Sequence, residues 1–471
     1  MSCAGLVLAS HGQLHWFNFE RHALTQIKFL LDRFATKPEA TAVVFRGESM
    51  SYGQLAVAVR QQIEWLEVQG IQPGTPVILR GDYSPLAVST LLALIERCCI
   101  IIPLTPEAYE SLRDSLNEVA PACMVDVSGD APILERLQSN HIPDLYKIVM
   151  ERQVPGLVLF TSGSSGKPKA VVHDFSKLLE KFHVVRPAMI TLNFLLFDHW
   201  GGLNTLLHCL SNLCLIVVPE RRTPEHVCEL IDAYDIELLP TTPSFLNMLL
   251  ISKAYTGRDL SSLKLITYGA EPMPETTLRN LRKVFPGIEL RQTYGMIELG
   301  VLRAKSRSPD SLWMKLGGDG YNIRVVDGIL QIRAEAAMLG YINADSPFTD
   351  DGFLITGDLV ETDGEWIRVL GRQSDIINVG GQKVYPAEVE SVLLDCPEVV
   401  DAVVYGESNP ILGKIVCANV VLREGCDEAS ARNSIRRLCR EQLQAFMVPL
   451  KTKFVDEIPQ SHRLKRVRSK S

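Results

Sequence analysis

A short loop of hydroxyls and glycines that ends in lysine follows an apolar stretch in the first half of the chain. Residues 157–169 read LVLFTSGSSGKPK. Glycines let backbone N–H groups approach phosphate oxygens, hydroxyls add donors, and a lysine neutralises phosphate charge. The loop is not a Walker A loop, because Pro168 follows Lys167 and no glycine stands five residues before Gly166. We therefore predict a phosphate-binding loop of another type, with a plain surface turn as the alternative.

The form of this loop resembles that of the adenylate-forming enzymes: acyl- and aryl-CoA synthetases, adenylation domains of nonribosomal peptide synthetases, and luciferases. Their loop reads approximately S/T-SGTTGxPKG, and Ala170 replaces its last glycine here. The resemblance implies that Lys169 is the loop lysine, with a catalytic role. It also implies that the nucleotide is bound by Thr161, Ser162, Gly163, Ser164, Ser165 and Gly166.

Two further segments resemble family motifs near the adenine. Residues 292–298 read QTYGMIE and are similar to the YGxTE motif, which implies that Tyr294 lies near adenine and that Glu298 binds Mg²⁺. A carboxylate suits a hard cation that also holds phosphate oxygens. Ile297 replaces the family threonine and removes a hydroxyl expected to face AMP. The adenine pocket is implied to include Gly269, Ala270 and Glu271.

Residues 356–358 and 371–381 resemble the ribose and hinge motifs. Asp358 of the TGD sequence is implied to accept hydrogen bonds from both ribose hydroxyls, and Arg372 to lie near ribose and phosphate. Ser374 takes the hinge position, where most relatives have Asp or Lys. Gly380 and Gly381 are implied to let the backbone approach the incoming thiol, with a simple turn as the alternative reading.

The C-terminal segment resembles the PxTxxGKxxR motif of the family. The alignment implies that Lys465 is the catalytic lysine of adenylation, with Leu464 where glycine is usual. The alternative is a solvated basic terminus, since four more basic residues surround this lysine: Arg463, Arg466, Arg468 and Lys470.

The acid substrate is implied to contact residues 197–202, which read FDHWGG. Aligned with the CoA-ligase form, His199 takes the histidine position and Trp200 shapes the pocket. Aligned with the peptide-synthetase form, Asp198 binds a substrate amino group instead. We favour the first alignment because residues 201–203 continue the ligase pattern, and a buried histidine without a role is a further alternative.

Short apolar runs alternate with helical spacing through much of the chain. The runs lie at residues 77–79, 98–104, 156–160, 214–219 and 264–268, and the helical segments include 53–68 and 224–234. This alternation predicts an α/β protein whose parallel sheet is covered by helices on both faces.

Hairpins replace this pattern from about residue 321. Asp327-Gly328 and Asp363-Gly364 each separate two strand-like runs, which predicts a β-rich subdomain. An α+β segment follows, with helices near 387–394 and 429–443 and strands near 399–405 and 415–423. We therefore expect a large N-terminal domain of layered α/β subdomains plus the β-rich subdomain at residues 1–370, and a small mobile C-terminal α+β domain at residues 371–471.

Composition limits the class of protein and its partners. The chain has 471 residues, 46% hydrophobic and 22% charged, with a net charge of −7 and 11 scattered cysteines. These values favour a globular enzyme with no general attraction for nucleic acid. With no clear signal peptide and no run long enough to span a membrane, we expect a cytoplasmic protein.

Together these features predict ATP-dependent activation of a small carboxylic acid as its acyl-adenylate, followed by thioester formation with coenzyme A. The implied cofactors are ATP, Mg²⁺ and coenzyme A, or the phosphopantetheine of an acyl carrier protein. A stand-alone enzyme that loads a carrier protein is one alternative, and a nucleotide-binding regulatory protein with a decayed active site is another. We expect a monomer or homodimer.

Overall fold

The computed structural model describes residues 5–8, 14–17, 24–139, 141–161, 167–309, 311–318 and 320–459. The chain divides into two compact units, each described by itself below. The first unit comprises residues 1–220, 297–300 and 336–346. The second unit comprises residues 221–296, 301–335 and 347–471.

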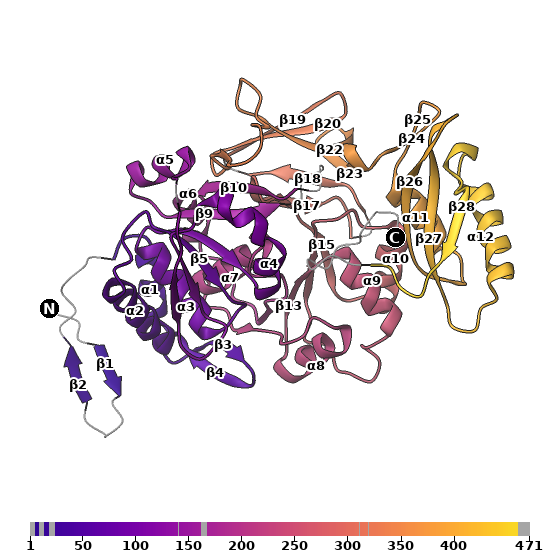
Figure 1. The fold of residues 1–471 in the computed structure, drawn as a ribbon. Helices are drawn as coiled ribbons and strands as arrows, with labels where there is room; N and C mark the ends of the chain where they lie inside the picture. Colours follow the sequence, from indigo (N-terminus) through magenta and orange to yellow (C-terminus); the bar gives the residue numbers. More distant parts are fainter. Residues whose placement is uncertain are drawn as a thin grey trace. The chain divides into compact units, whose positions relative to one another are not determined.

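A mixed sheet forms the centre of the first unit (Figure 1). Its strands, in spatial order, are β21 (Gly340–Tyr341), β10 (Lys169–Asp174), β9 (Gly156–Thr161), β6 (Ile100–Leu104), β5 (Pro76–Arg80), β7 (Cys123–Asp126) and β8 (Ile133–Arg136). The central strands are parallel, and the pairs at both edges are antiparallel. The parallel sheet predicted from the apolar runs is thus confirmed at its centre. The pairs β9–β10 and β7–β8 are antiparallel because the short connections of residues 162–168 and 127–132 can join only antiparallel strands.

Helix and strand formation in this unit follows directly from the residues. All five residues of β6 are buried, as expected for a strand covered on both faces. Helix α3 (Pro85–Glu96) starts after Ser84, whose side chain accepts the N–H of Ala87, and places proline in its first turn. Side chains of β6, β9 and β10 join one apolar core together with Tyr146 and Val149.

The first unit also contains strands of other sheets and further helices. Its other strands are β1 (Gly5–Leu8), β2 (Leu14–Phe17), β3 (Thr41–Phe45), β4 (Glu48–Ser51), β11 (Thr191–Leu192) and β12 (Ile216–Val217). Its other helices are α1 (Lys28–Phe34), α2 (Tyr52–Val68), α4 (Pro106–Ser111), α5 (Asp144–Arg152), α6 (Phe175–Leu179), α7 (Trp200–Ser211), and the 3₁₀ helices η1 (Arg113–Val119) and η2 (Glu180–His183). None of the helices in the described ranges combines the length and hydrophobicity required to cross a membrane.

The second unit begins with alternating helices and parallel strands. These elements are α8 (Pro224–Tyr234), β13 (Leu238–Thr241), α9 (Pro243–Ser252), β14 (Leu265–Tyr268), α10 (Glu275–Val284) and β15 (Glu289–Gln292). Threonine caps the first two helices, and a proline follows each cap. The strands β13, β14 and β15 are parallel neighbours, so their carboxyl ends share one edge.

The predicted β-rich segment is an antiparallel sheet. Its strands, in spatial order, are β16 (Tyr294–Met296), β17 (Gly300–Ser306), β18 (Met314–Gly317), β23 (Trp366–Arg372), β22 (Leu354–Asp363), β20 (Ile329–Ala334) and β19 (Tyr321–Val326). Asp327 and Gly328 both have positive φ and join β19 to β20, as a two-residue hairpin turn requires. The hairpin predicted at this position is confirmed.

The C-terminal segment forms a further sheet with two helices against it (Figure 1). Its elements, in chain order, are η3 (Gln373–Asp375), β24 (Ile377–Val379), β25 (Gln382–Val384), α11 (Pro386–Leu394), β26 (Val399–Asn409), β27 (Gly413–Leu422), α12 (Glu428–Gln442), η4 (Ala445–Met447) and β28 (Lys451–Phe454). Both helices contribute to one apolar core with β24, β26 and β27. The helices and strands predicted here are confirmed, and the domain boundary near residue 370 stays a prediction.

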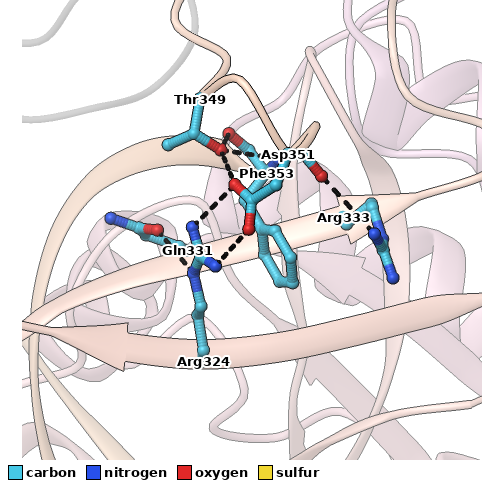
Figure 2. A network of polar contacts seen from close by, with 6 residues as sticks. All are labelled: Arg324, Gln331, Arg333, Thr349, Asp351 and Phe353. Atoms are coloured by element: carbon cyan, nitrogen blue, oxygen red, sulfur yellow. Dashed lines mark hydrogen bonds and ion pairs between the residues drawn. The ribbon is translucent and has the colours of Figure 1, made fainter.

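A polar network fixes the turn that leads into β22 (Figure 2). The guanidinium of Arg324 forms two hydrogen bonds with the Asp351 carboxylate, of 2.5 and 3.0 Å, and lies 3.9 Å from the Phe353 ring centroid. Thr349 Oγ1 donates to the same carboxylate over 2.6 Å. Since β22 carries Asp358, this network sets the entry to a strand with a candidate site residue.

The Asp351 carboxylate is expected to make stability depend on acid pH. The hydrogen bonds from Arg324 and Thr349 hold the pKa of Asp351 at about 2, below its ordinary value of 3.8. A carboxyl whose folded-state pKa is lowered stabilises the fold above its unfolded pKa, and this contribution disappears as pH falls from about 4 to about 2. Denaturant unfolding of wild type and Asp351→Asn should therefore give curves that differ at pH 7 and converge towards pH 2. A constant difference across this range would contradict the account.

Candidate functional site

A pocket of the second unit contains most of the predicted nucleotide-binding residues of that unit. It is lined by Ala270, Glu271, Pro272, Gln292, Thr293, Tyr294, Gly295, Asp358, Val369, Leu370, Gly371, Arg372, Asp375, Ile376, Tyr385, Pro386 and Ala387. These residues come from the carboxyl ends of β14 and β15 and from β16, β22, β23, η3 and the start of α11. Ligands of open α/β sheets bind at the carboxyl ends of the strands, so this is the place where a nucleotide is expected.

Asp358 is a buried hydrogen-bond acceptor that lines this pocket. The Tyr294 hydroxyl donates to one oxygen of its carboxylate over 2.6 Å, and Arg372 Nε lies 3.0 Å from the other. Burial and the Asp358 charge raise the pKa of Tyr294 far above its usual value, so the hydroxyl stays protonated and donates. A carboxylate accepts about four hydrogen bonds in total, so ligand hydroxyls can be held together with these two side chains.

Gly269 and Ala270 form the turn on which this pocket depends. A Cβ atom at Gly269 would lie 2.5 Å from Thr293 Oγ1 and 2.7 Å from the Thr293 carbonyl oxygen. Ala270 has a φ of +69°, a left-handed conformation that costs a non-glycine residue free energy and is concentrated at functional sites. Glu271 accepts the Ser244 hydroxyl over 2.6 Å. The backbone of this segment is therefore held close to the neighbouring strand end.

The phosphate loop of the first unit joins β9 to β10. Thr161 and Lys169 are directly opposite each other in this antiparallel pair, and residues 162–166 lie outside the described residues. Asn343 holds the end of the loop, because its Nδ2 donates to the Pro168 carbonyl and its Oδ1 accepts the Ala170 N–H over 2.9 Å. The loop base is thus fixed by a residue that is distant in sequence.

Glu298 lies in the first unit with Lys169 and Tyr341. Its side chain is buried, with 6% exposure, and one carboxylate oxygen accepts the Tyr341 hydroxyl over 2.7 Å. Lys169 Nζ lies 5.0 Å from the centroid of the same tyrosine ring. A buried carboxylate that is oriented by a tyrosine, which a lysine also contacts, fits a site for Mg²⁺ with phosphate oxygens. Among the described residues no three potential metal-ligating side chains of His, Cys, Asp or Glu are grouped, so phosphate and water would complete the coordination, as Mg²⁺ commonly requires.

His173 fixes the backbone next to Glu298. Its Nε2 lies 2.7 Å from the Ile297 carbonyl oxygen, so the ring donates there, and the Met338 N–H donates to the Glu298 carbonyl. Because β10 carries both Lys169 and His173, one strand positions the lysine and holds the segment of the acidic residue. The Glu298 backbone is thereby attached to the central sheet.

The buried His173 ring is expected to make the protein less stable below pH 6.5. Burial lowers the pKa of His173 to about 4 from its ordinary 6.5. The unfolded chain therefore binds the proton more tightly, so stability is complete above pH 6.5 and falls as pH decreases towards 4, by on the order of 3 kcal/mol. Replacement His173→Gln keeps an N–H donor and removes the titration. Its unfolding free energy should vary less with pH in this window, and an unchanged slope would contradict the prediction.

The predicted acid-binding residues lie at the start of α7. His199 is its N-cap residue, and His199 Nδ1 accepts the Gly201 N–H over 3.1 Å. Asp198 and Trp200 are buried. A Cβ atom at Gly202 would lie 2.1 Å from the Leu196 carbonyl oxygen, so the second glycine of the motif is required by packing. His199 thus has a structural role as the cap of α7, and its role toward a substrate stays a prediction.

Gly380 and Gly381 form the turn between β24 and β25. Both have positive φ, 57° and 87°, as a two-residue hairpin turn requires. The Gly381 N–H donates to Asn378 Oδ1. Ser374 lies in η3, and its hydroxyl donates to Asp375 over 3.0 Å. The turn alone explains both glycines, and the hinge and thiol roles stay predictions.

Several residues that complete these arrangements were not found from the sequence. Tyr341, Asn343 and His173 belong to no motif that we identified, and Glu118, which contacts Lys167 over 2.6 Å, is also distant from the loop. Lys167 lowers the pKa of Glu118. Tyr341 and Asn343 stand two residues apart after an apolar segment, and this spacing alone does not indicate a functional site. Lys465 lies outside the described residues.

Similar proteins of known activity cover nearly the whole chain. Indoleacetate–CoA ligase of Aromatoleum aromaticum is 27% identical, with 92% of this chain and 94% of that protein aligned. 2-Succinylbenzoate–CoA ligase of Bacillus subtilis is 25% identical, over 93% and 95%. The crystal structure of an anthranilate CoA ligase with anthranoyl-AMP has a TM-score of 0.79 at 20% identity, over 94% and 96%. This last likeness shows that the fold is shared and confirms the predicted fold class.

Two family models match the chain in the order that the motifs predict. The model described as AMP-binding enzyme C-terminal domain matches residues 388–465. The model described as AMP-binding enzyme matches residues 30–327, more than half of the 471 residues. This match includes the phosphate loop, the strand that carries Lys169 and the segment of Tyr294 and Glu298. The resemblance inferred from the motifs is therefore confirmed, and the chain belongs to the AMP-binding enzyme family.

Proposed function

We propose that the protein is an AMP-forming ligase that joins an aromatic carboxylic acid to coenzyme A. The observation that carries this proposal is the buried Asp358, held by Tyr294 and Arg372 in a pocket at the carboxyl ends of β14 and β15. Such a carboxylate accepts two ribose hydroxyls with charge-assisted strength. It distinguishes a nucleoside site from a site for inorganic phosphate alone.

The first half-reaction needs positioning and charge neutralisation rather than a protein nucleophile. A carboxylate oxygen of the acid attacks the α-phosphorus of ATP, and pyrophosphate leaves with the electron pair of the broken P–O bond. We assign the neutralisation of phosphate charge to Lys169, and the binding of Mg²⁺ to Glu298, with Lys465 at the carboxylate and α-phosphate. Removing one such preorganised group costs on the order of 10² to 10³ in rate.

Magnesium, when bound, supplies charge neutralisation at the leaving phosphates. Glu298 supports this assignment because Tyr341 orients its carboxylate. The hydrogen bond from Tyr341 uses one carboxylate oxygen of Glu298, so the other oxygen would be available to hold Mg²⁺. Lys169 Nζ, 5.0 Å from the Tyr341 ring centroid, adds a second positive charge.

The second half-reaction transfers the acyl group to a thiol. The thiolate sulfur attacks the acyl carbonyl, and AMP leaves with the former carboxylate oxygen. We assign the approach of the thiol to Gly380 and Gly381, with rotation of residues 371–471 about Ser374. Coenzyme A is favoured as acceptor over a carrier protein because the relatives are named CoA ligases.

The names of the same relatives favour an aromatic acid as the substrate of this chain. Indoleacetate, 2-succinylbenzoate and anthranilate, the acids in the names of those proteins, are all aromatic carboxylates. The names of these relatives support an aryl or arylalkyl acid as the substrate of the present chain.

Acid-dependent exchange between ATP and labelled pyrophosphate tests the proposal. We would measure it with benzoate, phenylacetate, indole-3-acetate, anthranilate, hexanoate and phenylalanine, beside Lys169→Ala and Lys465→Ala. Exchange that depends on an aromatic acid, and that both variants lose, is expected. ATP binding without exchange for any acid would favour a decayed nucleotide-binding protein instead. Competition between coenzyme A and a phosphopantetheinylated carrier protein would then identify the thiol.

A further inference from the structure

A polar cluster holds the end of the phosphate loop from outside the loop. Lys167 Nζ lies 2.6 Å from Oε1 of Glu118, which belongs to the distant helix η1. Oε2 of the same carboxylate accepts a hydrogen bond of 2.5 Å from Asn343 Nδ2. One carboxylate therefore joins a loop lysine to the residue that follows β21 and Ile342. All three side chains belong to the first unit.

The Asn343 amide fits this cluster in only one orientation. Its Oδ1 accepts the Ala170 N–H over 2.9 Å, and its Nδ2 donates to the Pro168 carbonyl oxygen over 3.0 Å as well as to Glu118. An amide nitrogen carries two donors and an amide oxygen only accepts, so a reversed amide would lose all three contacts. Asn343 thus fixes the backbone on both sides of Lys169.

The two lysines at the end of the loop differ in their partners. Lys167 is paired with Glu118, and its hydrogen bond is the main cause that lowers the pKa of this carboxyl, which stays ionised at neutral pH. Among the described residues, no carboxylate forms an ion pair with Lys169, whose Nζ lies 5.0 Å from the Tyr341 ring centroid. A lysine whose charge is already matched attracts phosphate less strongly. Lys169 is therefore the better phosphate ligand of the two.

The cluster is expected to affect kinetics more than stability. The Lys167 and Glu118 side chains are 63% and 28% exposed, and an ion pair in contact with solvent contributes little to the free energy of unfolding. Its contacts instead set where the loop end lies. A displacement of about 1 Å near reacting groups can cost about 10²-fold in rate.

We propose that Glu118 and Asn343 are positioning residues for the first half-reaction. Lys167 anchors the phosphate loop to them, and Lys169 serves the phosphates of ATP. This inference rests on the proposed function. It assigns opposite roles to two lysines of one loop, since one acts through a carboxylate of the protein and the other acts on the substrate.

A double-mutant cycle of Glu118→Gln and Lys167→Met tests the proposal. Each single variant should lower kcat/KM for ATP in pyrophosphate exchange by about tenfold and leave KM for the acid unchanged. The double variant should stay within about threefold of the weaker single variant, because the second change removes an anchor that is already broken. If the two losses multiply to about 10²-fold, Lys167 acts on phosphate independently of Glu118, and the proposal is overturned.

Asn343→Asp and a matched control extend the test. This substitution keeps an acceptor for the Ala170 N–H and places an oxygen opposite the Pro168 carbonyl and the Glu118 carboxylate. It should lower kcat/KM for ATP at least as much as Glu118→Gln. Lys147→Met breaks an exposed ion pair with Asp144 in the same unit and should keep wild-type kinetics.

Thermal unfolding shows whether each variant is folded, and if Asn343→Asp is not, the double-mutant cycle alone decides. A value of kcat/KM for ATP within about twofold of wild type in Glu118→Gln would overturn this inference and leave the proposed function intact. Absence of exchange in the wild-type protein with every acid would overturn the proposed function itself.

Discussion

Replacing Asp358 with alanine is expected to lower kcat/KM for ATP by roughly 10²- to 10⁴-fold. The variant removes a buried carboxylate that would accept both ribose hydroxyls, and each such charge-assisted hydrogen bond contributes about 1.5–3 kcal/mol. It also leaves the Tyr294 hydroxyl and Arg372 without their present acceptor. Steady-state kinetics of acid-dependent exchange at varied ATP measures this loss, most of which should be in KM for ATP.

Asp363→Ala is the matched control for this variant. Asp363 lies on the same strand, β22, and pairs with Arg307 at the exposed surface. Exposed ion pairs contribute little free energy, so this variant should keep nearly wild-type kinetics. Thermal unfolding of both variants separates loss of binding from loss of the fold. A folded Asp358→Ala protein whose kcat/KM for ATP stays within threefold of wild type would remove Asp358 from the nucleotide site.

Replacing Glu298 with glutamine is expected to lower the rate of pyrophosphate exchange by about 10²-fold or more. The amide keeps the shape of the side chain and removes the charge that would bind Mg²⁺. The Mg²⁺ concentration for half-maximal rate should rise at the same time, because a neutral oxygen binds a hard cation more weakly. A titration of exchange rate with Mg²⁺ at fixed ATP measures both effects.

Two further variants identify the cause of the Glu298 effect. Tyr341→Phe removes the hydroxyl that orients the carboxylate and should lower the rate by about tenfold, less than the loss of the charge itself. Glu180→Gln changes an exposed glutamate of the same unit and should have no effect. If Glu298→Gln lowers the rate and leaves the Mg²⁺ dependence unchanged, its role is other than metal binding.

The sequence was sufficient to predict these helices and strands and the family, because both predictions depend on local patterns. Continuous apolar runs specify buried parallel strands such as β6, and Asp327-Gly328 specifies a hairpin whatever surrounds it. The phosphate loop and the TGD sequence are likewise local. Their order along the chain made the resemblance specific, and the match of the AMP-binding enzyme family confirms it.

Contacts between distant residues could not be predicted in the same way. Asn343 is 173 residues from Ala170, whose N–H it accepts, and Tyr341 is 43 residues from Glu298. Asn343 meets Ala170 because β21 lies beside β10, and no single segment contains that information. The sequence also could not show that His199 caps α7, and it left open whether Gly380 and Gly381 only form a turn.

Oxygen-isotope transfer from the acid tests the central claim of acyl-adenylate formation most directly. We would supply an active aromatic acid with both carboxylate oxygens labelled as ¹⁸O, together with ATP, Mg²⁺ and coenzyme A, and analyse the nucleotide products by mass spectrometry. Attack of the carboxylate on the α-phosphorus, followed by thiol attack on the carbonyl, predicts AMP that carries one ¹⁸O atom. Unlabelled AMP, or ADP with ¹⁸O in inorganic phosphate, would contradict the account.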